Sequence, residues 1–139
     1  MEKTLVLIKP DGVENGHACA ILARLEATGV KLAATRMLKI SRETAEAHYA
    51  VHKERPFFAS VVSYITSGPV VAAVFQGEDA VIKVRKAMGA TDPAKAEVGT
   101  IRKDFAESIE RNAIHGSDSP ETAQFEIGLY FKPEDIFSY

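Results

Sequence analysis

Short apolar runs alternate with helically spaced apolar positions along the whole chain. Residues 4–8 and 70–75 are runs of β-branched and aliphatic side chains that predict buried strands, and Gly12 and Gly77 follow them as stop signals. Residues 15–28 carry apolar side chains every three or four positions, which predicts an amphipathic helix. By the same criteria, further strands are predicted at residues 30–40 and 112–118, and further helices at residues 41–52, 58–66, 79–88, 105–109 and from 119 onward.

The order of these elements indicates a fold class. It runs strand, helix, strand, a helical insertion, strand, helix, a long loop, strand and helix. Four strands are too few for a large doubly wound sheet and suit an α+β, ferredoxin-like two-layer sandwich, in which helices cover a four-stranded antiparallel sheet. Residues 89–99 follow neither periodicity and predict an irregular loop of the kind that often carries function. Because the chain has no repeat or linker, residues 1–139 are expected to form a single domain.

Composition and charge narrow the function classes. The chain has 17 basic and 19 acidic residues and a net charge of −2, so it lacks the general basicity of a nucleic-acid coat, and no nucleic-acid partner is required. Its single cysteine, Cys19, excludes an intramolecular disulfide and lies in an apolar helical pattern, where we expect it to fill the core. The absence of a leader segment and of an apolar run of about 18 residues predicts a soluble cytoplasmic protein without a membrane partner.

The segment 112–118 contains the most reactive candidate side chain. His115 lies between small and polar residues at the end of a predicted strand, so its imidazole is expected to be presented rather than buried. An imidazole with its ordinary pKa of roughly 6.5 is largely neutral, and therefore nucleophilic, near neutral pH. Alternatively, Gly116, Ser117 and Asp118 only serve a tight turn and the histidine is their surface neighbour. The residues alone leave both interpretations open.

Any phosphate group must be held by side chains in this protein. Neither G-x-x-x-x-G-K-[ST] nor G-x-G-x-x-G occurs in the chain. Lysine supplies a compact charge and arginine a pair of aligned donors for phosphate oxygens. Four residues at element ends or in loops could act together in this way: Lys9, Arg85, Thr91 and Arg102. For each taken singly, a solvated surface position is the alternative, although Lys9 directly follows an apolar strand.

Aromatic, acidic and histidine side chains complete the set of candidates. Two phenylalanines follow residue 56, and one of them, Phe57, could stack on a nucleobase at the surface, or both could be core residues. Glu126 lies beside the apolar stripe of the last helix, where it could fix one tautomer of His115 or remain a solvated acid. His48 and His52 match no metal-binding motif, so structural or surface roles are expected for them.

These residues resemble those of a known family. Residues 112–118 are similar to the N-x-x-H-G-S-D active-site signature of nucleoside diphosphate kinases. The resemblance extends over essentially the whole chain and is highly specific in its order. It continues, in register, at residues 7–12, 48–49, 55–58, 67–70, 99–102 and 126–131.

The resemblance implies a role for each candidate residue. His115 would be the phosphorylated nucleophile, with one ring nitrogen held by Glu126 and that carboxylate assisted by Ser117. Tyr49 would support the transferring group, and Phe57 would stack on the base opposite an apolar contact such as Ile109. Contacts to phosphates and ribose would come from Lys9, Arg85, Thr91, Arg102 and Asn112.

The resemblance also implies the reaction and its cofactor. The γ-phosphoryl group of a nucleoside triphosphate, typically ATP, would pass to a nucleoside diphosphate through a phosphohistidine on His115 by a ping-pong mechanism, which maintains nucleotide pools. Mg²⁺ would ride on the nucleotide's phosphates, so no protein metal ligands are expected. Many eukaryotic relatives have a proline near Val98 and further residues after the position of Tyr139, so a dimer or tetramer is expected rather than their hexamer.

Two interpretations from other classes remain as alternatives. The same four-stranded sandwich serves RNA-binding modules that stack bases on aromatic side chains of the sheet. The chain lacks their aromatic motif and its net charge is negative. A regulatory domain that binds a small ligand without turnover is the second alternative.

Overall fold

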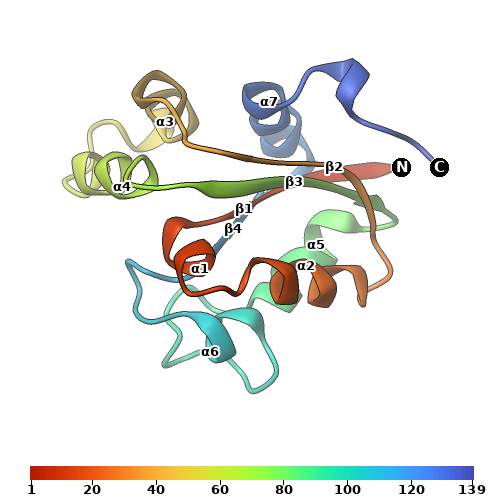
Figure 1. Cartoon of the computed structure of the whole chain (residues 1–139), viewed down its shortest axis with the longest axis horizontal. Coiled ribbons are helices and arrows are strands. Elements are labelled where there is room, and N and C mark those ends of the chain that lie inside the picture. Colours follow the sequence, from red (N-terminus) through yellow and green to blue (C-terminus); the bar gives the residue numbers. More distant parts are fainter.

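A four-stranded antiparallel sheet forms the centre of the molecule, and helices cover both of its faces (Figure 1). The computed structural model describes all 139 residues. The strands lie side by side in the order β2-β3-β1-β4. This order confirms the predicted α+β, ferredoxin-like class. In chain order, the strands are β1 (Glu2–Ile8), β2 (Lys31–Leu38), β3 (Val70–Gly77) and β4 (Ile114–Gly116).

The helices fall into two groups on opposite faces of the sheet (Figure 1). One face carries the two helices that connect strands of the sandwich, α2 (Ala18–Glu26) and α5 (Ala80–Met88). The same face also carries two short helices, α1 (Pro10–Glu14) and α6 (Ile101–Phe105). The other face carries the predicted helical insertion and the last helix: α3 (Arg42–His48), α4 (Phe58–Ile65) and α7 (Pro120–Tyr130). Two short 3₁₀ helices complete the chain, at Ala50–His52 and Pro133–Asp135. None of these helices is long and apolar enough to cross a membrane.

Each face of the sheet has its own apolar core because side chains alternate along a strand. Leu5 and Leu7 of β1 belong to the cluster under α3, α4 and α7, whereas Val6 and Ile8 belong to the cluster under α2 and α5. Every residue of β3 is buried, as expected for a central strand covered on both faces. The two cores together hold β1 rigidly, and β1 is the strand that carries β4 at its side.

Several predicted boundaries were wrong by a few residues. The helix predicted at 15–28 is the shorter helix α2, and the short helix α1, which starts at Pro10, was not predicted. The helix predicted at 105–109 lies instead at α6, where the Thr100 side chain accepts a hydrogen bond from the backbone of Lys103 and caps the helix start. The strand predicted at 112–118 has only three residues.

The expected burial of Cys19 was also wrong. The thiol is exposed, and the core-facing positions of α2 are Ile21 and Leu25. Small apolar residues surround the cysteine in sequence, and such residues are tolerated at the surface of a helix as well as in its core.

A γ-turn places β4 against β1. Ala113 has a φ of 72°, and the backbone N–H of Ile114 donates to the carbonyl of Asn112 at 2.9 Å. This left-handed backbone is uncommon for a residue with a side chain. Asp11 holds it, because one carboxylate oxygen accepts from the Ala113 N–H at 3.0 Å and the other accepts from the Tyr64 hydroxyl. The turn therefore ends the preceding loop and starts the three-residue strand that carries the candidate nucleophile.

Candidate active site

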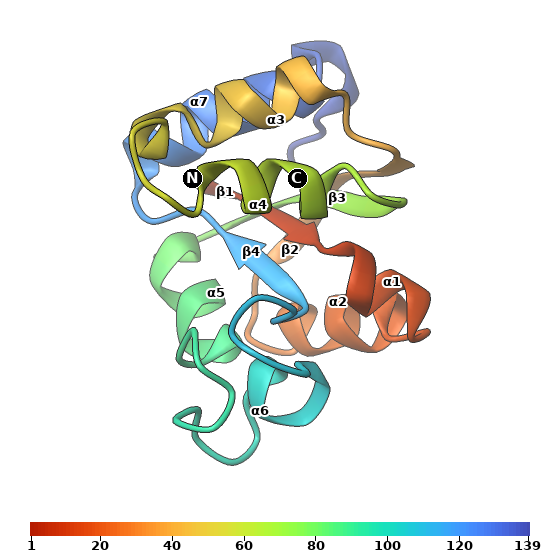
Figure 2. The same cartoon turned by 90° about the vertical axis from the view of Figure 1, so that its left-hand side faces the viewer.

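His115 occupies the middle of β4, opposite Leu7 of β1. Strand β4 lies near the centre of the view in Figure 2. Its Nε2 lies 3.0 Å from the Glu126 Oε1 of α7. A carboxylate accepts and never donates when ionised, so Nε2 carries the ring proton in the neutral tautomer. Nδ1 then keeps its lone pair, and it has no hydrogen-bond partner in the protein. The imidazole is thus oriented with its nucleophilic nitrogen free.

Glu126 is fixed by a second set of donors. Ser117 donates its hydroxyl to Oε1 at 2.7 Å and accepts the Leu5 N–H at 3.1 Å, so the β1 backbone aligns the hydroxyl for the carboxylate. The two side chains are buried. Sequence reasoning paired Glu126 with His115 and Ser117, and the structure brings these three residues together.

His48 is a partner that sequence reasoning missed. Its Nε2 lies 3.2 Å from Glu126 Oε2, and its Nδ1 lies 2.8 Å from the Tyr130 hydroxyl. Its Nε2 also lies 3.2 Å from His115 Nε2. Since both Nε2 atoms donate to the same carboxylate, we interpret this last contact as two parallel N–H groups rather than a hydrogen bond. His48 stands 67 residues before His115, and no spacing rule connects them.

The pKa directions agree with this arrangement. Burial alone raises the pKa of Glu126, but the hydrogen bonds from His115 and His48 outweigh it and hold the pKa far below its ordinary value. Burial is also the main cause that lowers the pKa of His115 below 6.5, against the opposing pull of Glu126. The carboxylate is therefore ionised and the imidazole neutral near pH 7, which is the protonation state a nucleophile needs.

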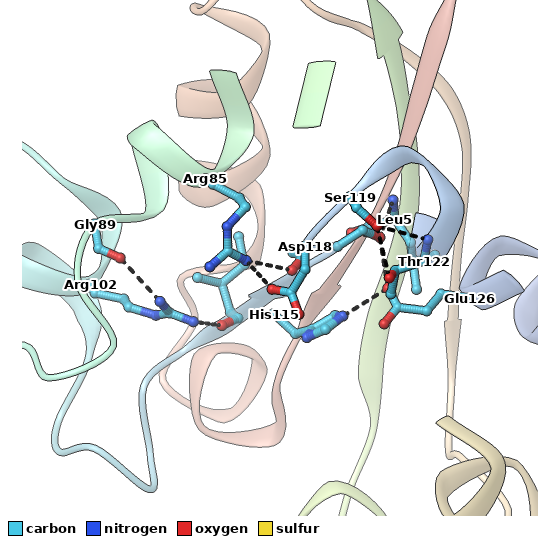
Figure 3. A network of polar contacts seen from close by, with 12 residues as sticks. Leu5, Arg85, Gly89, Arg102, His115, Asp118, Ser119, Thr122 and Glu126 are labelled. Atoms are coloured by element: carbon cyan, nitrogen blue, oxygen red, sulfur yellow. Dashed lines mark hydrogen bonds and ion pairs between the residues drawn. The ribbon is translucent and has the colours of Figure 1, made fainter. Parts of the chain in front are cut away.

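Two arginines hold the backbone on either side of His115 (Figure 3). Arg102 of α6 is buried and donates from Nη2 to the Ile114 carbonyl at 2.8 Å and from Nη1 to the Gly89 carbonyl at 3.1 Å. Its buried Nε has no partner. Arg85 of α5 donates to the Gly116 carbonyl at 3.1 Å and pairs with Asp118 at 2.8 Å. Both predicted cations thus lie beside the nucleophile, where they can also reach an anion.

Lys9 and Asn112 meet on the other side of the site. The Lys9 Nζ donates to Asn112 Oδ1 at 2.9 Å. Burial, and then the charge of Arg102, lower the pKa of Lys9 to about 8, although Asp11 opposes the change. Asn112 in turn reaches toward the carbonyl of Thr91, 3.5 Å away. The lysine is therefore still mostly a cation at pH 7, although its surroundings disfavour that charge.

The remaining candidates line a cleft that runs past His115. It consists of two adjoining hollows of about 610 and 470 Å³, which share Tyr49 and Thr91 in their walls. The first contains His115 and the two arginines, and the second contains Lys9 and Asn112. The second hollow also contains Phe57 and Ile109, which do not line the first hollow and are 47% and 52% exposed. Of the predicted site residues, only Ser117 is not on these walls, because it lies behind Glu126.

Tyr49 takes a half-buried position between the two hollows. Its ring stacks on His48 with centroids 4.6 Å apart, and the centroid of the His115 ring is 6.5 Å away. Burial, followed by the charge of Glu126, raises the pKa of the Tyr49 hydroxyl, so this group remains a neutral donor. A neutral donor at this place can contact a group bound at His115.

Comparison with known proteins assigns this site to a family. The sequence model described as Nucleoside diphosphate kinase matches residues 2–136. The chain belongs to this family. Among its relatives, a nucleoside diphosphate kinase of Dehalococcoides mccartyi is 56% identical over 139 residues, which cover 100% of this chain and 98% of the relative. A nucleoside diphosphate kinase of Halorhodospira halophila is 55% identical over 138 residues and covers 99% and 98%.

Solved structures of nucleoside diphosphate kinases have the same fold. The enzyme of Aquifex aeolicus has a TM-score of 0.95 at 44% identity, with 98% of this chain and 99% of that chain covered. The enzyme of Halobacterium salinarum, solved in complex with CDP, has a TM-score of 0.95 at 44% identity, with 99% and 92% covered. The resemblance that segment 112–118 indicated is confirmed, and the chain is a phosphotransferase of this family.

Proposed function

We propose that this chain transfers the γ-phosphoryl group of a nucleoside triphosphate, typically ATP, to a nucleoside diphosphate through a phosphohistidine on His115. The main support for this proposal is that Glu126 holds Nε2 of His115 while Nδ1 is free in a cleft lined by cations. The family model spans nearly the whole chain, which supports one catalytic domain over residues 1–139. The reaction would maintain the balance of nucleotide pools in the cytoplasm.

The first half-reaction follows from the orientation of the imidazole. Nδ1 attacks the γ-phosphorus in line, a nitrogen–phosphorus bond forms, and the bond from the γ-phosphorus to the β,γ-bridging oxygen breaks. The nucleoside diphosphate leaves with the electron pair of that bond. The ring now carries positive charge, which the ionised Glu126 stabilises through the Nε2 proton. A different diphosphate then enters the same cleft and takes the phosphoryl group back from Nδ1, which makes the kinetics ping-pong.

The cations of the cleft are suited to the charge that this reaction develops. Arg102 Nε is a buried donor without a partner, and an oxygen of a bound phosphate would satisfy it. Lys9 and Arg85 add charge on either side of His115, Tyr49 offers its hydroxyl to the transferring group, and Asn112 and Thr91 face the sugar and the other phosphates. Preorganised donors of this kind stabilise a transition state because they need no rearrangement as charge moves.

Mg²⁺ fits this site as a partner of the nucleotide rather than of the protein. The ion prefers oxygen ligands in an octahedral arrangement. The hollow around His115 contains Arg85 and Arg102, and the carboxylate of Asp118 in the same hollow is engaged by Arg85. When bound to the phosphates of the nucleotide, the ion would neutralise charge on the leaving group. We therefore propose that Mg²⁺ enters with the substrate.

The far hollow is proposed to hold the base. Phe57 offers a ring face, and Ile109 offers an apolar contact in the wall of the same hollow. Stacking does not depend on the hydrogen-bonding edge of a base, so it accommodates all nucleotides. The Halobacterium relative was solved in complex with CDP, which supports nucleotide binding by this chain. The expected assembly is a homo-oligomer, a dimer or a tetramer.

A labelling experiment tests this function. The protein is incubated with γ-labelled ATP and Mg²⁺, and the phosphoenzyme is expected to be acid-labile, base-stable and discharged by GDP to give labelled GTP. His115→Ala should abolish the label, whereas His17→Gln, at a histidine outside the cleft, should keep it. Failure of the native protein to label, or a label that persists in His115→Ala, contradicts the proposal.

A further inference from the structure

The cluster around Glu126 has the donor set of a transition-metal site. His48 Nε2, His115 Nε2 and the Glu126 carboxylate lie within 4.8 Å of one another. Neighbouring donor atoms are 3.2, 3.2 and 3.0 Å apart. A tetrahedral Zn²⁺ with ordinary bond lengths keeps its donors roughly 3.3 Å apart, so an ion fits between these three groups with little movement. Two imidazoles and one glutamate are also the protein ligands of known zinc enzymes with one open position.

The groups behind these donors are those that metal ligands usually have. The second nitrogen of His48 lies 2.8 Å from the Tyr130 hydroxyl, and Ser117 donates to the carboxylate of Glu126 at 2.7 Å. Such partners hold ligands in place and raise metal affinity. The side chains of His48 and Glu126 are only 1% and 6% exposed, which limits their motion. All three residues also line the first hollow of the cleft, from which a fourth ligand can reach an ion.

The donors select the kind of ion. Imidazole nitrogen suits Zn²⁺, Cu²⁺ and Ni²⁺, whereas Mg²⁺ prefers oxygen and keeps its waters. The site therefore discriminates between the ion of the substrate and ions of the zinc class. The neighbouring cations Lys9, Arg85 and Arg102 oppose a further positive charge, so the affinity should be below that of a structural zinc site.

We propose that His48, His115 and Glu126 form an inhibitory site for Zn²⁺ or a similar divalent transition metal. An ion on Nε2 of His115 displaces the proton from that nitrogen, and the proton moves to Nδ1. The Nδ1 lone pair is then no longer available for attack on phosphorus. His48 changes tautomer in the same way and donates from Nδ1 to the Tyr130 hydroxyl, so both rings remain neutral. Binding stands on the geometry alone, whereas inhibition rests on the proposed function of His115.

Binding is tested directly in a Cys19→Ser background, which removes the exposed thiol as a competing ligand. ZnCl₂ is titrated into the protein by calorimetry in buffer that contains excess Mg²⁺, and CoCl₂ is titrated with the visible spectrum recorded. One equivalent of Zn²⁺ and an intense tetrahedral Co²⁺ spectrum are expected. His48→Gln and Glu126→Gln should each weaken binding at least about tenfold, and His17→Gln should leave it unchanged. No saturable equivalent, or one that survives both ligand substitutions, overturns the site.

Inhibition is tested by the order of addition. Zn²⁺ added before γ-labelled ATP and Mg²⁺ should prevent phosphorylation of His115, and EDTA followed by fresh Mg²⁺ should restore it. His48→Gln labels more slowly than the native protein, but its remaining labelling should require at least about tenfold more Zn²⁺ for the same inhibition. Equal sensitivity in the two proteins overturns the inhibitory role. A native protein that binds Zn²⁺ but never labels contradicts the phosphohistidine proposal and leaves the metal site standing.

Discussion

The two ends of the cleft are built in opposite ways. At the His115 end, a buried network joins β4, α7, α3 and the backbone of β1 through hydrogen bonds of 2.7 to 3.2 Å. At the other end, Phe57 and Ile109 are about half exposed. The first end fixes one atom, Nδ1 of His115, and the second offers only apolar surface.

This difference matches what each end has to do. Phosphoryl transfer needs the nucleophile aligned with the phosphorus atom, and small displacements are costly. Stacking of a base tolerates changes of position and of base identity. We therefore expect substitutions in the buried network to affect the rate of the chemical step, and substitutions at the exposed end to affect mainly substrate affinity.

The largest effect is expected for Glu126→Gln, which tests whether the buried end of the cleft controls the chemical step. The amide cannot carry negative charge and cannot stabilise a cationic His115, so kcat should fall by about 10²-fold or more with little change in KM. Steady-state phosphotransfer from ATP to a diphosphate measures both values. Glu134→Gln, on an exposed acid outside the cleft, should match the native rate. A small change in kcat would show that the buried carboxylate does not control the nucleophile.

The pH profile of kcat/KM reports the pKa values of groups in the free enzyme, and it therefore tests the charge states of His115 and Lys9. Burial lowers the pKa of His115, so the loss of rate on the acid side should begin at a lower pH than for an ordinary imidazole. Above pH 8 the ammonium of Lys9, whose pKa is about 8, loses its charge, and the rate should fall up to about tenfold per pH unit. Lys9→Arg should move this alkaline limb to higher pH. A limb that stays in place would exclude Lys9 as its cause.

Ser117→Ala should have a smaller effect on activity and a separate effect on stability. It removes a donor to Glu126 and leaves the buried Leu5 N–H without its side-chain acceptor. The free energy of unfolding should fall by about 1–3 kcal/mol, and kcat by about fivefold to tenfold. Urea denaturation and steady-state rates measure the two. Ser63→Ala, at an exposed position on α4, serves as the control.

The smallest effect is expected at the exposed end. Phe57→Ala removes a half-exposed stacking surface, which is worth about 1 kcal/mol, so KM for the nucleotide should rise about fivefold while kcat stays nearly constant. The comparison can be made for ADP, GDP and CDP, with Phe137→Ala as an exposed control. A fall in kcat that matches the rise in KM would show that the base also positions the phosphates.

Much of the architecture could be predicted because it depends on local patterns. The apolar run at 70–75 and the amphipathic helices led to the correct sheet and class, and the segment around His115 led to the correct family. The pairing of His48 with Glu126 could not be predicted, because it is a contact between distant elements that depends on how α3 and α7 pack. The γ-turn at Ala113 could not be predicted for a similar reason, since Asp11 stabilises it from another part of the chain.

The hydrogen bonds of Arg102 and Arg85 to the carbonyls of Ile114 and Gly116 have a dynamic consequence. The two guanidinium groups are tied to the residues immediately before and after the nucleophile, so thermal displacement of β4 carries its cations along. The separation between His115 and these charges should fluctuate less than the position of either relative to the rest of the sheet. Accurate catalysis at this edge strand then depends on His115, its two arginines and Glu126 keeping their positions relative to one another.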